Sequence, residues 1–154
     1  MAELLVDKSI MTEALAELHV VPKSVAFTRE EENLSAIGHI LGYPYWVRSS
    51  SGSSGLGSLK ISNEVALRNW LVLNPDVEFF LASQYLPGRN LACKLLYWKG
   101  KLVRAASAER VNYIMAKVVP SGITGNTSFG RLLNEPQLVE IADRAMQHIF
   151  KKTG

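Results

Sequence analysis

The spacing of apolar residues predicts three helices in the first half of the chain, separated by short strands. Helical spacing extends over Lys8–Leu18, Leu34–Leu41 and Val65–Leu73. Thr28 and Glu31 form a capping box that is expected to open the second helix, and Ser62 is the expected N-cap of the third. Runs of β-branched, aromatic and aliphatic residues predict strands at Ser24–Phe27, Tyr45–Arg48, Leu59–Ile61 and Glu78–Ser83.

The second half of the chain has the pattern of an antiparallel hairpin followed by one helix. Leu91–Trp98 and Leu102–Ala108 are the predicted strands, joined by a turn at Lys99-Gly100. Val111–Val119 is apolar and compatible with a further strand, and Pro120–Gly130 is predicted to be a loop. Asn134 is the expected cap of the last helix. The pattern as a whole predicts an α+β fold with two small lobes, residues 1–83 and 84–154.

Composition narrows the class of protein without defining it. At 154 residues and 47% hydrophobic composition, the chain can bury a core. A net charge of +3 is too small to indicate binding to nucleic acid or to an acidic membrane surface, and no apolar run is long enough for a membrane span. The single cysteine, Cys93, and the lack of a secretory pattern favour a cytoplasmic location. The dispersed histidines predict no zinc site.

A glycine–serine loop at residues 49–58 follows the strand that ends at Arg48. Glycines let backbone N–H groups turn toward an anion, hydroxyls add donors, and a guanidinium offers two parallel donors to phosphate oxygens. The loop is equally compatible with a flexible linker. The candidate phosphate-binding residues in it are Ser51, Gly52, Ser53, Ser54, Gly55 and Gly57.

Four stretches in order resemble the ATP-grasp superfamily, and within it the carbamoyl-phosphate synthetase and biotin carboxylase type. They are Asp7-Lys8 at a helix start, the strand Leu41-Gly42-Tyr43-Pro44-Tyr45-Trp46-Val47-Arg48, the stretch Phe80–Asn90, and Gly100–Val103 followed by Arg110 and Pro120-Ser121-Gly122. The resemblance covers nearly the whole chain. It implies an ATP-grasp fold and a site for ATP between two lobes.

The resemblance also implies roles for individual residues. Lys8 and Arg48 would hold the phosphates of ATP, and Arg110 would face the acyl-phosphate. Arg48 and Arg110 are thus the candidate catalytic residues. The hinge between the lobes would bind adenine through backbone groups of Ser83 and Tyr85. The other hinge candidates are Gln84, Leu86 and the ribose-facing Asn90.

Two departures from the family pattern bear on activity. Gln84 and Asn90 stand where relatives often carry acids. The chain also ends at Gly154, before the strands that bring the magnesium ligands in relatives, so Mg2+ is expected only with such a segment. Phosphoryl transfer depends on metal and positioning, and this chain by itself is therefore expected not to turn over ATP.

Two functions remain open at this point. The chain is either the ATP-binding part of a carboxylate–amine ligase, which forms an acyl-phosphate from a carboxylate or bicarbonate in a longer protein, or a non-catalytic module that senses nucleotide or acts as a scaffold. Its expected partners are ATP, a small carboxylate, and either a second copy as a homo-oligomer or further segments of a ligase. An RNA-binding function is less favoured than these two, because strand alternation places some of the basic residues around Tyr97-Trp98 on opposite faces.

Overall fold

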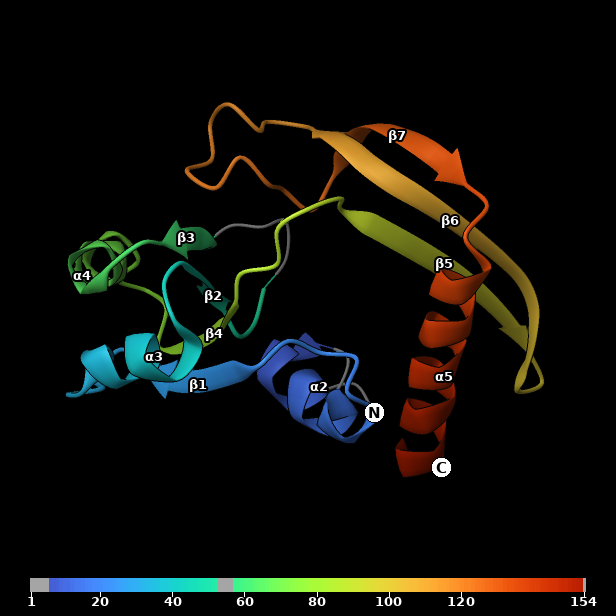
Figure 1. The fold of residues 1–154 in the computed structure, drawn as a ribbon, viewed down its shortest axis with the longest axis horizontal. Helices are drawn as coiled ribbons and strands as arrows, with labels where there is room; N and C mark the ends of the chain where they lie inside the picture. The colour runs from blue at the N-terminus through green and yellow to red at the C-terminus, as the bar shows by residue number, and fades with distance from the viewer. Residues whose placement is uncertain (1–5, 53–56, 154) are drawn as a thin grey trace.

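Two antiparallel sheets, one in each half of the chain, organise the fold (Figure 1). The structure is a computed structural model that describes residues 6–52 and 57–153. Its first half contains α2 (Lys8–Leu15), the 3-10 helix η1 (Ala16–Leu18), β1 (Ser24–Thr28), α3 (Leu34–Leu41), β2 (Tyr45–Ser49), β3 (Leu59–Ile61), α4 (Glu64–Leu73) and β4 (Phe79–Gln84). Its second half contains β5 (Leu91–Trp98), β6 (Lys101–Tyr113), β7 (Thr127–Leu133) and α5 (Pro136–Thr153).

The first sheet has four strands in the order β1-β4-β2-β3, and every neighbouring pair is antiparallel. One face packs against α3 and α4 around a core that includes Phe27, Ile37, Tyr45, Ile61 and Phe80. Alternation along the strands places every second residue on this core. The α+β prediction with helices on antiparallel sheets is therefore confirmed.

The opposite face of this sheet carries Ala26, Trp46, Arg48, Lys60, Leu81 and Ser83, and we call it the cation face. Helix α2 lies over one side of the cation face, so that the side chain of Leu81 is buried beneath it. Arg48 lies in β2 and Lys60 lies in β3. These two cations are therefore on the side of the cation face that is away from β1.

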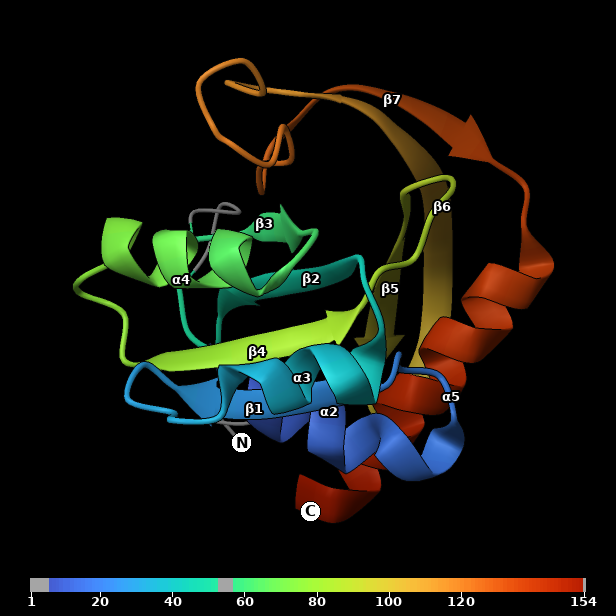
Figure 2. The same ribbon diagram turned by 60° about the vertical axis from the view of Figure 1, so that its left-hand side comes forward.

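The second sheet, β5-β6-β7, curves beside the first lobe, and α5 packs on β5 and β6 (Figure 2). Tyr97 fixes this helix, since its hydroxyl donates to Asp143 at 2.5 Å and its ring meets Phe150 edge-on. Helix α5 also contacts α2, where His148 Nε2 lies 3.1 Å from Ala14 O, and the same nitrogen lies 2.8 Å from a carboxylate oxygen of Glu17 in η1. The two halves of the chain are thus joined by a helix–helix contact as well as by the hinge.

The helix starts differ from three sequence predictions. Helix α3 begins after Asn33, whose side chain accepts from Ala36 N, because Thr28 is still paired with Phe79 in the sheet. Helix α4 is capped by Asn63 instead of Ser62. Helix α5 begins at Pro136, with Glu135 O accepting from the first helical amides, so Asn134 lies outside the cap position.

The region after β6 also departs from prediction. The residues from Val111 to Val119 do not form a separate strand. Strand β6 instead continues to Tyr113 and is followed by turns. The predicted loop 120–130 contains the start of β7, which pairs with β6 from Thr127 onward. The loop between these strands arches toward β3 in both views (Figures 1 and 2).

Candidate functional site

Lys8 and Arg48 converge at the start of the glycine–serine loop. The Asp7 side chain caps α2 by accepting from Ser9 N and Ile10 N, which fixes Lys8 in the first helical position. Arg48 extends from the cation face near the end of β2. The positive charge of Arg48 acts on the Lys8 ammonium, so the two cations are electrostatic neighbours.

The environment of this cation pair disfavours its charge in the absence of a ligand. Burial lowers the pKa of Lys8 below its ordinary value, the charge of Arg48 lowers it further, and Asp7 partly opposes the shift. Burial likewise lowers the pKa of Arg48. The Arg48 Nε is buried and has no hydrogen-bond partner among the described residues. An anion placed beside the two side chains would relieve the repulsion between them.

Lys8 also holds the first residues of the loop. Its backbone N–H donates to Ser50 O at 2.8 Å, and its Nζ donates to Ser50 O at 3.3 Å and to Gly52 O at 2.8 Å. Ser50 N in turn donates to Phe79 O at 3.0 Å. The start of the loop is therefore fixed to both α2 and β4.

The other loop candidates divide into three groups. Ser51 and Gly52 are exposed beside Lys8, and Gly52 has a positive φ of 86° that favours glycine. Gly57 closes the loop with a φ of 72° just before the buried Ser58. The predictions for Ser53, Ser54 and Gly55 fall outside the described residues.

The hinge candidates lie at the other end of β4. Ser83 is buried, with Ser24 and Trp46 opposite it in the neighbouring strands, and its hydroxyl lies 3.0 Å from the Ser24 hydroxyl. Gln84 is exposed, and its backbone N–H donates to Lys23 O. Past the last strand pair come Tyr85, half-buried, and Leu86, 64% exposed. Among the described residues, the strand pairs of β4 end at Gln84, so Tyr85 is the first hinge residue beyond the sheet.

The structure shows one hinge contact that sequence reasoning missed. The Lys60 ammonium lies over the ring of Tyr85, 4.3 Å from its centroid. The two residues are far apart in the chain and meet only because β3 and β4 share the strand β2 between them. Strand alternation was the available signal, since it places Lys60 on the same face as Arg48.

Arg110 is engaged by the loop between β6 and β7. Its Nε donates to Thr127 Oγ1 at 2.7 Å, and its Nη2 donates to Thr124 O at 3.1 Å and Gly125 O at 2.7 Å. The guanidinium also lies 4.7 Å from the ring centroid of Tyr113. Asn90 is exposed and accepts the backbone N–H of Arg110 at 2.7 Å. Arg110 and Asn90 are therefore neighbours, and Arg110 also contacts the loop between β6 and β7.

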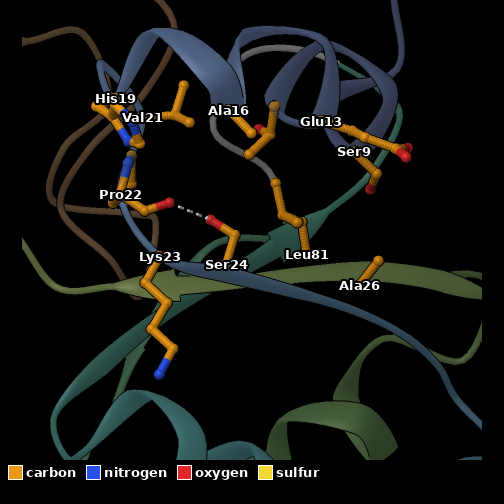
Figure 3. Close-up of a pocket in the computed structure, with 11 residues that line it drawn as sticks. Ser9, Glu13, Ala16, His19, Val21, Pro22, Lys23, Ser24, Ala26 and Leu81 are labelled. Carbon is orange, nitrogen blue, oxygen red and sulfur yellow. Dashed lines mark hydrogen bonds between the residues drawn. The ribbon is translucent and has the colours of Figure 1, made fainter.

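A cavity of about 540 Å³ lies between α2 and the part of the sheet around β1 (Figure 3). Its floor includes Ala26 and Leu81, and Ser24 at its edge donates to Pro22 O at 2.9 Å. Glu13 and neutral hydroxyls supply most of its polar groups, and Lys23 extends away from the helix in Figure 3. A carboxylate in the wall disfavours a polyphosphate, so this cavity is a weaker candidate for an anion site than the surroundings of Lys8 and Arg48.

Among residues 6–52 and 57–153, no helix combines the length and hydropathy that a membrane span requires. The same residues contain no group of three or more His, Cys, Asp and Glu side chains that could hold a metal ion.

Solved structures with the ATP-grasp fold match almost the entire chain. D-alanine–D-alanine ligase from Bacillus anthracis matches with a TM-score of 0.66 and 18% identity, over 96% of this chain and 48% of that one. N5-carboxyaminoimidazole synthase from Aspergillus clavatus, solved with ADP and 5-aminoimidazole ribonucleotide, matches with 0.71 and 14%, over 95% and 38%. The Staphylococcus aureus synthetase with ADP matches with 0.70 and 20%, over 95% and 38%.

These likenesses define the fold as that of ATP-grasp enzymes. The chain spans half or less of the length of these matched structures. No protein-family model and no curated protein matches the chain. The expected nearness to carbamoyl-phosphate synthetase and biotin carboxylase is not specifically shown by these matches.

Proposed function

We propose that the chain is the ATP-binding part of an ATP-grasp carboxylate–amine ligase. The observation that carries this proposal is the convergence of Lys8 and Arg48 at the start of the glycine–serine loop, with the Arg48 Nε buried and without a partner among the described residues. The neighbouring cations lack a counter-ion at hydrogen-bond distance in the described part of the chain, and a triphosphate would supply one. The fold of the matched ligases supports the same reading.

In this proposal the nucleotide spans the cation face. The phosphates lie between Lys8 and Arg48, and the adenine lies at the hinge, where Tyr85 is the first residue beyond the sheet. Ser51, Gly52 and Gly57 let the loop approach the phosphates, and Leu86 and Asn90 border the base and the ribose.

The chemistry of the complete ligase would run through an acyl-phosphate. A carboxylate or bicarbonate oxygen attacks the γ-phosphorus of ATP, ADP leaves, and an amine or ammonia then displaces phosphate from the acyl carbon. Lys8 and Arg48 stabilise charge on the transferring group by position and electrostatics. Arg110 contributes by holding the loop between β6 and β7 toward that region. A magnesium ion bound together with the phosphates would supply further stabilisation of the charge on the transferring group.

Calorimetric titration with ATP, with and without Mg2+, tests the proposal. Arg48→Ala is expected to weaken binding by about tenfold or more, because a hydrogen-bonded charge pair is lost. Lys101→Ala is the matched control, since Lys101 is an exposed lysine of the other sheet. Binding that is unchanged in Arg48→Ala contradicts the proposal. Absence of binding in the unmodified chain favours the scaffold function.

A further inference from the structure

We propose that the cavity between α2 and β1 is a binding site for a small hydroxylated amine, separate from the proposed nucleotide site. The cavity has a volume of about 540 Å³, which lies within the range of small-molecule sites. Helix α2 and the turn after it form one wall, and β1 with β4 forms the other (Figure 3). The inference goes beyond the proposed function, because it concerns a second ligand and requires no contact with ATP.

Small side chains on both walls leave this space open. Ala16 lines it from η1, directly after α2, and Ala26 lines it from β1. Ala26 remains exposed although the helix lies over this side of the sheet. A methyl group is too short to fill the space between a helix and a sheet, so the cavity follows from the residue types at these two positions. A larger side chain at Ala26 would therefore fill it.

One side of α2 supplies polar groups to the cavity. Ser9 lies three residues before Thr12 and four before Glu13, so the three side chains share a face of the helix. Among the described residues, these side chains have no hydrogen-bond or ion-pair partner. In the opposite wall, the Ser24 hydroxyl donates to Pro22 O at 2.9 Å, so its own proton is already used. The cavity thus presents hydroxyl groups and one carboxylate to a ligand.

The charge of the lining favours a cation. Glu13 contributes its carboxylate, whereas Lys23, at the edge, extends away from the helix in Figure 3. An ammonium group has three donors and forms charge-assisted hydrogen bonds with a carboxylate. Hydroxyl groups of a ligand can both donate to and accept from the serine and threonine hydroxyls, and the His19 ring adds a further polar atom. A compact amine that carries several hydroxyl groups matches this set of partners.

The cavity is adjacent to the cation pair but does not include it. Ala26, Leu81 and Arg48 form one row across three neighbouring strands. Neighbouring strands lie about 4.8 Å apart, so the backbones of Ala26 and Arg48 are separated by roughly 10 Å. The cavity lining within the described part of the chain contains Leu81, but neither Lys8 nor Arg48. The two sites can therefore be tested independently.

The test uses glucosamine as the amine, with glucose and glucuronate as neutral and acidic sugars that have the same ring. Calorimetry and amide chemical shifts are measured at a slightly acidic pH, at which the amine is protonated. Glucosamine is expected to bind and to shift the amide signals of α2 and β1. Glucose should bind about tenfold more weakly, as for a lost charged hydrogen bond, and glucuronate should bind more weakly still.

Two variants locate the binding. Glu13→Gln keeps the size of an exposed side chain and should remove the preference for glucosamine over glucose. Ala26→Leu should fill the cavity and abolish binding of both sugars. Glu140→Gln is the matched control for the first variant, since Glu140 is an exposed glutamate of α5, and it should bind glucosamine like the unmodified chain.

Three results would overturn the inference. One is the absence of glucosamine binding by the unmodified chain. The second is an unchanged preference for glucosamine in Glu13→Gln, which would place the amine elsewhere. The third is equal affinity for glucosamine and glucuronate. Each of these results leaves the proposed function standing, because failure of that function would instead show as ATP binding that is insensitive to Arg48→Ala.

Discussion

The two sheets of this protein use the same kind of side chain in opposite ways. In the first sheet, Arg48 projects from a face whose reverse side is packed into the core, and its Nε lacks a partner among the described residues. In the second sheet, Arg110 donates to Thr127, Thr124 and Gly125 and lies against Tyr113. A guanidinium that already has protein acceptors supports structure, and one that lacks them is available to a ligand.

The packing of the sheets differs in the same direction. Phe80 and Ile61 in the first sheet are completely buried, whereas Leu96 and Leu132 in the second are 60% and 82% exposed. A well-packed reverse face holds the strands of the first sheet in register, so cations on its other face keep their positions. The candidate site thus lies on the more rigidly supported of the two sheets.

The largest expected effect separates the two sheets by stability. Phe80→Ala removes a fully buried ring and should lower the free energy of unfolding by about 3–5 kcal/mol. Leu96→Ala, at a largely exposed position, should change it by about 0.5 kcal/mol or less. Urea denaturation followed by tryptophan fluorescence measures both. Equal losses would show that the second sheet is packed as tightly as the first.

A smaller effect separates the two arginines. Arg110→Ala leaves the carbonyl groups of Thr124 and Gly125 without their donor and should cost about 1–3 kcal/mol, with faster amide exchange in the loop between β6 and β7. Arg48→Met should alter stability by less than about 1 kcal/mol, since it removes a desolvated donor that lacks a partner.

Hydrogen exchange and denaturation of both arginine variants test this contrast. A large stability loss in Arg48→Met, with no change in Arg110→Ala, would reverse the assignment of the two residues.

The smallest effect is a pH dependence of ATP affinity at Lys8, which belongs to the helix α2 that lies over the first sheet. The pKa of Lys8 lies below its ordinary value of 10.5, so the charged form is disfavoured in the folded, ligand-free protein. This penalty is present below the folded pKa and is relieved as pH rises through it toward 10.5. A bound phosphate favours the charged form, so ATP affinity should fall as pH rises through the lowered pKa.

Titration of ATP affinity from neutral to alkaline pH measures this effect, and Lys8→Arg serves as the control because arginine stays charged. An affinity that falls identically in Lys8→Arg would assign the pH dependence to another group.

Local sequence signals predicted most of the fold because they depend on neighbouring residues. Helical spacing and the Lys99-Gly100 turn placed α2, α4, β5 and most of β6 close to their observed bounds. Helix starts were less certain because Thr28, Asn33, Ser62 and Asn63 all carry cap-forming side chains. Thr28 is paired with Phe79 in the sheet, and this pairing depends on tertiary contacts that the local sequence does not show.

The features that were missed depend on contacts between distant segments. Strand β7 has an almost fully exposed burial pattern and contains Gly130, so it shows no alternation of apolar and polar residues. The contact between Lys60 and Tyr85 needs three strands in register. The convergence of Lys8 and Arg48 was expected from the family resemblance, and spacing alone could not separate it from two solvated cations.

The hydrogen bonds from the Lys8 ammonium to the carbonyls of Ser50 and Gly52 imply a competition. An ammonium has three protons, and two of them already serve the loop in the ligand-free protein. Under the proposed function, an arriving phosphate takes the third proton first, and a second bond to the phosphate displaces a loop carbonyl. Ligand capture and the hold on the loop are then coupled, and the rate of nucleotide association would report how firmly the empty protein holds its own backbone.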